Sequence, residues 1–224
     1  MRNRWIWRRL NSAGYGVQSP NDFYFVQHVL RERSPYYAYE ALEALIDEYS
    51  RTIPCYPEGV CKLLFRLANH VHPSTIVEVG TSLSSLALTM ACPTARMMSI
   101  TSSLQCAEAM QPLMPHYPQV EIKIGDEMAL FYQSLPTLSP IGILHVAHTP
   151  HYREVVDAAL RHTSNHTLLI IEGIRDSKDT LAWWHHLLKS QPTGICYDLG
   201  SLGLILIDHS RHKETYWIKL RNKI

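Results

Sequence analysis

The sequence predicts an α/β fold with a central, mostly parallel sheet, and three observations carry this prediction. A β-branched run at 75–79 leads through a turn of small residues into a helical pattern at 85–91, which is a strand, turn and helix start of the kind that binds nucleotides. Short apolar runs then alternate with helical patterns, which indicates βαβ units. The chain ends in short strand-like segments separated by turn residues, which predicts a terminal antiparallel hairpin.

Residues 1–72 are predicted to form a helical cap on the sheet. Apolar residues recur there at the spacing of helices, with Asn21 and Asp22 as candidate N-caps of the first one. The predicted helices cover 23–31, 39–49 and 59–70. We interpret the basic and aromatic segment that precedes them as an amphipathic first helix packed on the domain, with contact to a membrane surface or a nucleic acid as the alternative.

Residues 73–224 are predicted to form the sheet domain, which makes one structural unit with the cap. Its parallel strands are expected at 75–79, 96–100, 119–124, 141–146 and 167–172, and its helices at 85–91, 103–114, 127–134, 151–162 and 177–190. Three more segments with strand character follow at 194–198, 203–208 and 215–220. From these segments we expect a Rossmann-like sheet of seven strands, five parallel and two in the C-terminal hairpin.

Composition excludes several classes of protein. Hydrophobic residues make up 46% and charged residues 18% of the 224 residues, which is the balance of a globular rather than a disordered protein. The formal net charge is +1, so no overall field attracts nucleic acid, and no apolar run is long enough to span a membrane. The five scattered cysteines form no CxxC pair, and we expect reduced thiols in a cytoplasmic protein.

Several short motifs, taken in order, resemble those of one family. They are Gly16-Val17-Gln18-Ser19-Pro20, Glu78-Val79-Gly80-Thr81-Ser82-Leu83, Gly125-Asp126, the run from Glu172 to Lys178 with Trp184, and Asp198-Leu199 with Gly203. Their order and spacing resemble the class I S-adenosylmethionine-dependent methyltransferases, most closely a Bacteroidetes-type branch, with a degenerate cofactor motif. The resemblance covers nearly the whole chain. It implies a methyltransferase sheet, S-adenosylmethionine as cofactor and a small molecule as methyl acceptor.

The resemblance also implies which residues bind the cofactor. Glu78 matches the acid that orients the amino group of the cofactor, and Gly80 and Thr81 match the turn after the first strand. The full set expected from the resemblance is Glu78, Gly80, Thr81, Ser82, Ser84, Thr101, Gly125 and Asp126.

Four positions depart from the pattern of the family. Ser84 stands where the turn has a further glycine, and Thr101 stands where an acid accepts hydrogen bonds from the ribose. His145 lies at a strand end that lacks the aspartate of the family, and Gly173 replaces one of a late pair of aspartates. Because Mg²⁺ prefers carboxylate oxygens, we expect no metal site.

The candidate catalytic residues are His145, His148 and Glu172. The two histidines, with His151, are expected at the carboxyl end of the fourth strand, on the rim where open sheets bind ligands. A histidine there could act as general base on a hydroxyl or amine, with Glu172 near the acceptor. Zinc binding and an ordinary role as polar loop residues are the alternatives.

The sequence favours a methyltransferase that acts on a small molecule, with no nucleic-acid partner and no membrane span. Whether the chain is a monomer or a homodimer stays open. The alternative function is that of a non-catalytic protein of the same fold, which has lost or changed its cofactor and serves as a binding or interaction module. A nicotinamide dehydrogenase is excluded, because G-x-G-x-x-G and an acid at the end of the second strand are both missing.

Overall fold

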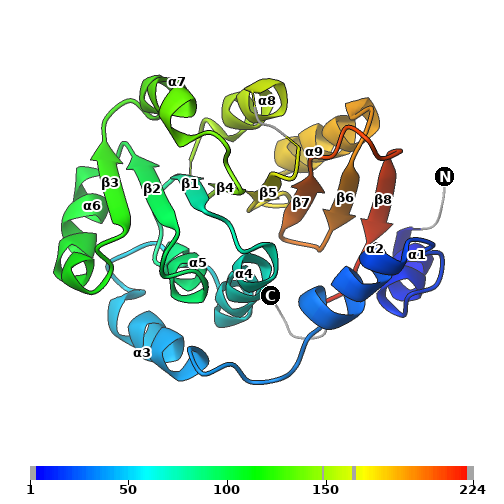
Figure 1. Ribbon diagram of the computed structural model, residues 1–224, viewed down its shortest axis with the longest axis horizontal. Coiled ribbons are helices and arrows are strands. Elements are labelled where there is room, and N and C mark those ends of the chain that lie inside the picture. Colours follow the sequence, from blue (N-terminus) through cyan, green and yellow to red (C-terminus); the bar gives the residue numbers. More distant parts are fainter. Residues whose placement is uncertain (1–3, 148, 163–164, 221–224) are drawn as a thin grey trace.

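A computed structural model describes residues 4–147, 149–162 and 165–220, and it shows one central sheet between two layers of helices (Figure 1). The strand order is β3-β2-β1-β4-β5-β7-β6-β8. The first five strands run parallel, and β7 is antiparallel to both of its neighbours. The strands are β1 (Thr75–Val79), β2 (Arg96–Thr101), β3 (Val120–Ile124), β4 (Ile143–Val146), β5 (Leu168–Ile171), β6 (Ile195–Asp198), β7 (Gly203–Leu206) and β8 (Glu214–Trp217).

The sheet has eight strands within the described residues, so the expectation of seven was wrong by one. The extra strand is β8, which pairs in parallel with the outer side of β6. Three strand-like segments were visible in the tail of the sequence, but strand character does not reveal which segment finds a free sheet edge. The five parallel strands and the antiparallel β6–β7 pair confirm the rest of the prediction.

The helices follow the predicted positions within a few residues. They are α1 (Arg4–Ser12), α2 (Pro20–Phe25), the π-helix η1 (Val26–Leu30), α3 (Tyr39–Tyr49), α4 (Glu58–Val71), α5 (Ser85–Ala91), α6 (Leu104–Met110), the 3₁₀-helix η2 (Gln111–His116), α7 (Glu127–Leu138), α8 (Tyr152–His162) and α9 (Lys178–Ser190).

The first predicted cap helix begins earlier than expected. Ser19 is the N-cap of α2, because its hydroxyl accepts the N–H of Asp22 at 3.3 Å. The expectation of Asn21 or Asp22 as N-cap was therefore wrong. Asp22 is buried and instead pairs with Arg211 at 2.7 Å, a contact 189 residues away in the chain that local sequence does not reveal.

Helices cover both faces of the sheet, and neighbouring residues of each strand point to opposite cores. Ile76 of β1 packs in the core that includes α4 and α5, whereas Val77 packs in the core that includes α7, α8 and α9. A small third core joins Leu83 to Ile53 and Cys106. This third core lies under the turn that follows β1, so it fixes the position of that turn.

The amphipathic first helix packs on the domain, as expected. In Figure 1, α1 lies beside β8 at the edge of the sheet. Arg8 donates to the Asp198 carboxylate at 2.6 Å and to the carbonyl of Ile218 at 3.3 Å. Arg2 of the same basic segment lies outside the described residues. None of the described helices has the length and apolar character needed to cross a bilayer.

Candidate functional site

The order of the strands reverses between β1 and β4. In open α/β sheets, ligands bind in the crevice outside the carboxyl ends of the strands at such a reversal. Three ionisable side chains lie at this place. Glu78 of β1 is directly opposite His145 of β4 in the register, and Glu172 follows the last residue of β5. Because β1, β4 and β5 are neighbours in the sheet, the three side chains meet.

His145 connects the two carboxylates. Its Nδ1 lies 2.9 Å from Oε1 of Glu78, and its Nε2 lies 2.8 Å from Oε1 of Glu172. All three side chains are fully buried. An imidazolium can donate from both ring nitrogens, whereas a neutral imidazole can donate from only one. The arrangement therefore fits a protonated ring between two carboxylates.

The charges of this triad follow from burial and proximity. Burial lowers the pKa of His145, but the Glu172 and Glu78 carboxylates outweigh burial and raise that pKa to about 10. Burial raises the pKa of Glu172, and the attraction of His145 offsets part of the rise. Within the described residues, no group of three His, Cys, Asp or Glu side chains is placed to hold a metal ion.

Three serine hydroxyls also donate to Glu78. Ser99 donates to Oε2 at 2.5 Å, Ser82 donates to Oε1 at 3.4 Å, and Ser85 donates to Oε1 as well. A further hydrogen bond joins the hydroxyl groups of Thr81 and Ser99, whose oxygens lie 2.8 Å apart. The acid expected to orient the cofactor is thus surrounded by protein donors in this structure.

The turn after β1 has the backbone of a ligand-binding turn. Gly80 has φ of +90°, a conformation that favours glycine. The backbone N–H groups of Thr81 and Ser82, both buried, have no acceptor among the residues that the structure describes. Buried N–H groups are nearly always paired, with protein, water or ligand. The turn therefore keeps two donors for a bound group.

The segment between α3 and α4 closes over this turn. The carbonyl of Pro54 accepts the N–H of Leu83 at 2.8 Å, and the N–H of Tyr56 donates to the hydroxyl of Ser84 at 3.2 Å. Ser84 stands where the family has a glycine, and here its hydroxyl helps to hold the covering segment. We call 54–56 the covering segment.

Glu127, the first residue of α7, closes the crevice from the other side. Its carboxylate accepts the N–H and the hydroxyl of Ser102, both at 3.0 Å, and the hydroxyl of Thr149. Ser102 follows β2 and Thr149 follows β4, and β1 lies between these strands. The carboxylate of Glu127 therefore bridges the loops on both sides of the crevice, and we call this contact the Glu127 bridge.

The other expected cofactor residues lie near the ends of β2 and β3. Thr101 is buried, and its hydroxyl accepts the N–H of Ser103 at 3.1 Å. The N–H of Gly125 donates to the carbonyl of Thr101 at 3.0 Å. Asp126 is exposed and caps α7 by accepting the N–H of Ala129 at 2.7 Å. His148, an expected catalytic residue, lies outside the described residues.

A cavity of about 350 Å³ opens beside the triad. Glu172 lines it, together with Tyr56 of the covering segment, Tyr152 of α8, Asp176, and Trp183 of α9. We call it the acidic cavity. Oε1 of Glu172 faces His145, whereas its Oε2 has no hydrogen-bond partner among the described residues. Glu172 is the member of the triad that lines the cavity, whereas His145 and Glu78 are not part of the lining.

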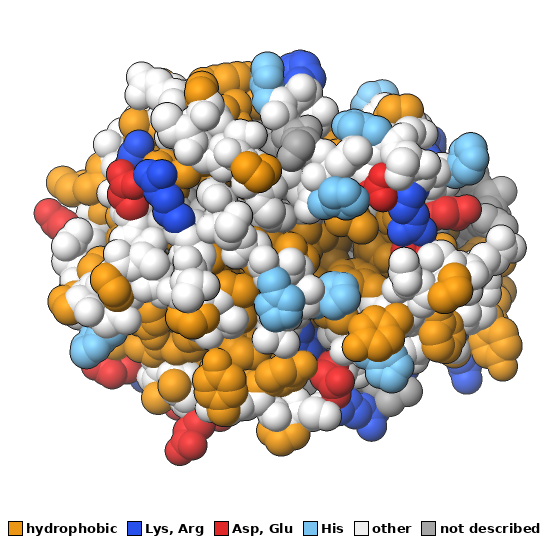
Figure 2. Space-filling model, in the orientation of Figure 1, with side chains coloured by type: hydrophobic (Ala, Val, Ile, Leu, Met, Phe, Trp, Pro, Cys, Tyr) orange, Lys and Arg blue, Asp and Glu red, His pale blue; other side chains and the backbone are white. Residues whose placement is uncertain are grey.

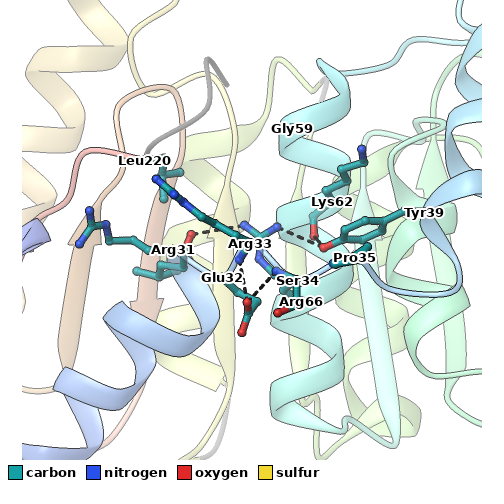
Figure 3. Close-up of a pocket in the computed structure, with 11 residues that line it drawn as sticks. Arg31, Glu32, Arg33, Ser34, Pro35, Tyr39, Gly59, Lys62, Arg66 and Leu220 are labelled. Atoms are coloured by element: carbon teal, nitrogen blue, oxygen red, sulfur yellow. Dashed lines mark hydrogen bonds between the residues drawn. The ribbon is translucent and has the colours of Figure 1, made fainter.

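A second pocket, of about 210 Å³, lies in the helical cap and has the opposite charge (Figure 3). Its lining includes Arg31, Arg33, Lys62 and Arg66. Several of these cations already have partners inside the cap: Arg66 donates to the Tyr39 hydroxyl at 3.2 Å and Lys62 pairs with two glutamates. This basic pocket is therefore part of the packing of the cap.

Away from His145, three of the described histidines, His28, His70 and His72, line one pocket, and they form no metal-binding group there. Figure 2 shows histidine side chains spread over one face of the molecule, among acidic and basic side chains that are also interspersed. His70 contacts the rings of Tyr24 and Phe25, which is an ordinary packing role.

The sequence matches no family model and no curated protein. Comparison with solved structures finds similar folds. The O-methyltransferase TomG from Streptomyces achromogenes, in complex with S-adenosylmethionine, is 21% identical, with a TM-score of 0.57 over 92% of this chain and 99% of that one. An O-methyltransferase from Bacillus cereus, in complex with S-adenosylhomocysteine, is 16% identical, with a TM-score of 0.61 over 85% of this chain and 99% of that one.

The chain has the fold of the class I methyltransferases. The S-adenosylhomocysteine-bound methyltransferase PaMTH1 from Podospora anserina agrees, with a TM-score of 0.62 over 88% of this chain and 97% of that one, at 14% identity. At this level of identity the likeness concerns the fold, and the Bacteroidetes-type branch stays a prediction.

Sequence reasoning missed several residues of this site. Glu127 follows the Gly125-Asp126 pair directly, so its position at a helix start was a signal that it could reach the rim. Asp176 lies within the same motif as Glu172, but the sequence does not show that its carboxylate lines the same cavity. Tyr56 and Trp183 come from the cap and from α9, and only the fold brings them to one cavity.

Proposed function

We propose that this protein is an S-adenosylmethionine-dependent methyltransferase that acts on a small molecule. The observation that carries the proposal is the place of the acidic cavity. It lies at the carboxyl ends of β4 and β5, and Glu172 in its lining is joined through His145 to Glu78 at the base of the turn. A donor site at the turn and an acceptor site in the cavity would thus be neighbours.

The residues of the turn fit the cofactor chemically. The unpaired N–H groups of Thr81 and Ser82 would donate to its carboxylate, and Glu78 would attract its amino group. The hydroxyl of Thr101 would accept one hydrogen bond from the ribose. The covering segment and the Glu127 bridge must separate before the cofactor enters, because they close the crevice in this structure.

When bound, S-adenosylmethionine supplies an electrophilic methyl group. The contribution of the chain is then to hold the acceptor close to that group and in line with it, which is the main source of rate in such transfers. Glu172 would accept a proton from the acceptor through its free Oε2. His145 would act as a positioning residue, since its two hydrogen bonds fix the orientation of both carboxylates.

The second candidate function is that of a non-catalytic protein with this fold. A specific observation favours it: the Glu78 carboxylate is fully buried and accepts hydrogen bonds from three serines as well as His145. A cofactor would have to compete with these donors. The two candidates differ in whether the crevice opens.

Calorimetric titration with S-adenosylmethionine and S-adenosylhomocysteine tests the proposal. We expect a Kd in the micromolar range, on the order of −8 kcal/mol of binding free energy. Gly80→Arg should abolish binding, because its side chain would fill the close approach at the turn; circular dichroism must show that this variant is folded. No heat at millimolar ligand, together with an unchanged Tm, would support the non-catalytic function.

A further inference from the structure

Two carboxylates line the acidic cavity, and the His145 ring that pairs with one of them is buried and shared with Glu78. Glu172 and Asp176 contribute carboxylates, and no Lys, Arg or His occurs among the described residues that line the cavity. Arg175, which lies between them in sequence, is directed elsewhere: it donates to Asp198 at 2.8 Å and to the carbonyl of Gly200. An anionic ligand would meet two like charges there, and a cationic one would meet two partners.

Glu172, which lines this cavity, has a buried carboxylate oxygen without a hydrogen bond to the described part of the chain. Its side chain is fully buried, and its Oε2 has no hydrogen-bond partner among the described residues. A buried carboxylate oxygen without a donor costs free energy unless a ligand or water supplies one. Burial, and then the charges of Glu172 and Asp176, raise the pKa of Tyr56 in the lining of the cavity.

The loop after β5 holds the Asp176 carboxylate against the backbone of Gly173. Gly173 has φ of +68°, and a Cβ built on it would lie 2.3 Å from Oδ2 of Asp176. Only glycine at this position allows the Asp176 carboxylate to fold against the backbone. The turn is closed by the N–H of Asp176, which donates to the carbonyl of Gly173 at 3.0 Å.

Aromatic rings form another part of the lining. Tyr152 and Trp183 pack edge to face, with ring centroids 4.8 Å apart, and Tyr56 lies in the covering segment. The guanidinium of Arg153 lies 5.4 Å from the centroid of the Tyr152 ring, outside the cavity lining. Carboxylates combined with aromatic rings are the recognition chemistry of organic cations, through ion pairing and cation–π attraction.

We propose that the acidic cavity binds an organic ammonium group, held by Glu172 and Asp176, with its apolar part against Tyr152 and Trp183. Where the ligand is the methyl acceptor, this inference rests on the proposed function, and the acceptor is an amine. The bound ammonium first gives a proton to Oε2 of Glu172. The nitrogen lone pair then forms the new N–C bond while the C–S bond of the sulfonium breaks, and the leaving thioether keeps that electron pair.

The test is a titration of the full chain, without S-adenosylmethionine, followed by calorimetry and tryptophan fluorescence. Three probes share one apolar part and differ in charge: phenethylammonium, 2-phenylethanol and 3-phenylpropionate. We expect the ammonium to bind about tenfold or more tightly than the alcohol, and the carboxylate not to bind. Asp176→Asn should weaken ammonium binding about fivefold to tenfold, since it removes one of two charges. Asp179→Asn, an exposed position outside the lining, is the matched control and should change nothing.

Equal affinity for the ammonium and the alcohol would overturn the inference, and so would unchanged binding in Asp176→Asn or no binding of any probe at about 50 mM. Because the cofactor is absent, these results are separate from the proposed function. If the chain binds S-adenosylmethionine but not the ammonium, the acceptor is of another class. If it binds the ammonium but not S-adenosylmethionine, the cavity is a cation site on a non-catalytic fold.

Discussion

Two buried carboxylates near the carboxyl ends of β5 and β6, which β7 separates in the sheet, are satisfied in different ways. Asp198, at the end of β6, accepts from Arg8 at 2.6 Å and Gly200 at 3.2 Å on one oxygen, and from Arg175 at 2.8 Å and Trp184 at 3.3 Å on the other. Both arginines also reach solvent. Each oxygen of Asp198 thus has two donors, and the group ties α1, α9 and the loop after β5 to the hairpin.

Glu172, which directly follows β5, is less fully satisfied by the described residues. His145 is bonded to Oε1, the Tyr56 hydroxyl acts to lower the pKa of Glu172, and Oε2 has no partner with hydrogen-bond geometry among those residues. The cation that balances Glu172 is itself completely buried and shared with Glu78. Asp198 is therefore a structural carboxylate, whereas Glu172 is held in place through Oε1 and keeps Oε2 for a ligand.

Removing the shared cation should have the largest effect. His145→Leu leaves Glu78 and Glu172 buried and adjacent with no positive charge between them, so we expect a loss of about 3–5 kcal/mol in the free energy of unfolding. Urea denaturation followed by circular dichroism measures it. His116→Leu, at an exposed position, should stay within about 0.5 kcal/mol of the natural protein. If His145→Leu lowers the free energy of unfolding by less than Asp198→Asn does, the triad is not the stronger of the two carboxylate networks.

Asp198→Asn should cost less, about 2–4 kcal/mol, because the two arginines it leaves behind can turn toward water. The same urea experiment gives the value, with Asp157→Asn on the exposed side of α8 as control. An effect of under about 1 kcal/mol would show that the contacts of α1 and Arg175 with the hairpin contribute little.

The networks around His145 and around Asp198 should lose their contributions to the free energy of unfolding at opposite ends of the pH range. The folded pKa of His145 is raised to about 10 from 6.5, so its contribution is complete below pH 6.5 and is lost as pH rises through about 10. Burial acts to raise the pKa of Asp198, but Arg175 and Arg8 outweigh it and lower that pKa. The contribution of Asp198 is therefore present above its ordinary pKa and is lost as pH falls through the lowered folded value.

The free-energy difference between the natural protein and His145→Leu should thus shrink by roughly 1–3 kcal/mol between about pH 6 and pH 10. The corresponding difference for Asp198→Asn should be constant over that range and should shrink only in acid. Unfolding curves at a series of pH values test both. If the difference in free energy of unfolding between the natural protein and His145→Leu grows with pH, the His145 ring is neutral in the folded protein.

Gly173→Ala should have the smallest effect on stability, about 1 kcal/mol, because φ of +68° is strained for a residue with a Cβ. The new Cβ also displaces the Asp176 carboxylate, so ammonium affinity should fall together with stability. Gly59→Ala, in the first turn of α4, is a control of opposite sign, since alanine favours a helix. Unchanged ammonium binding in Gly173→Ala would show that Asp176 does not depend on the loop conformation.

Most of the fold could be predicted from local sequence, because strand and helix periodicities and the N-cap Ser177 are local signals. The site was predicted only in part. Alternation placed Glu78 and His145 near strand ends, but it did not show that they pair, because the register of β1 against β4 is a non-local property. The Glu127 bridge depends on Ser102 and Thr149 from two different loops, so it could not be read from a single stretch of the chain.

We propose that the crevice above Gly80 opens to admit S-adenosylmethionine. The most direct measurement is calorimetric titration of the cofactor into the natural protein and into Glu127→Gln, with Glu154→Gln on the exposed face of α8 as control. Because the variant weakens a charge-assisted bridge that closes the crevice, we predict binding about threefold to tenfold tighter than in the natural protein and the control. Absence of binding in all three proteins at millimolar cofactor, with no change in Tm, would contradict the claim.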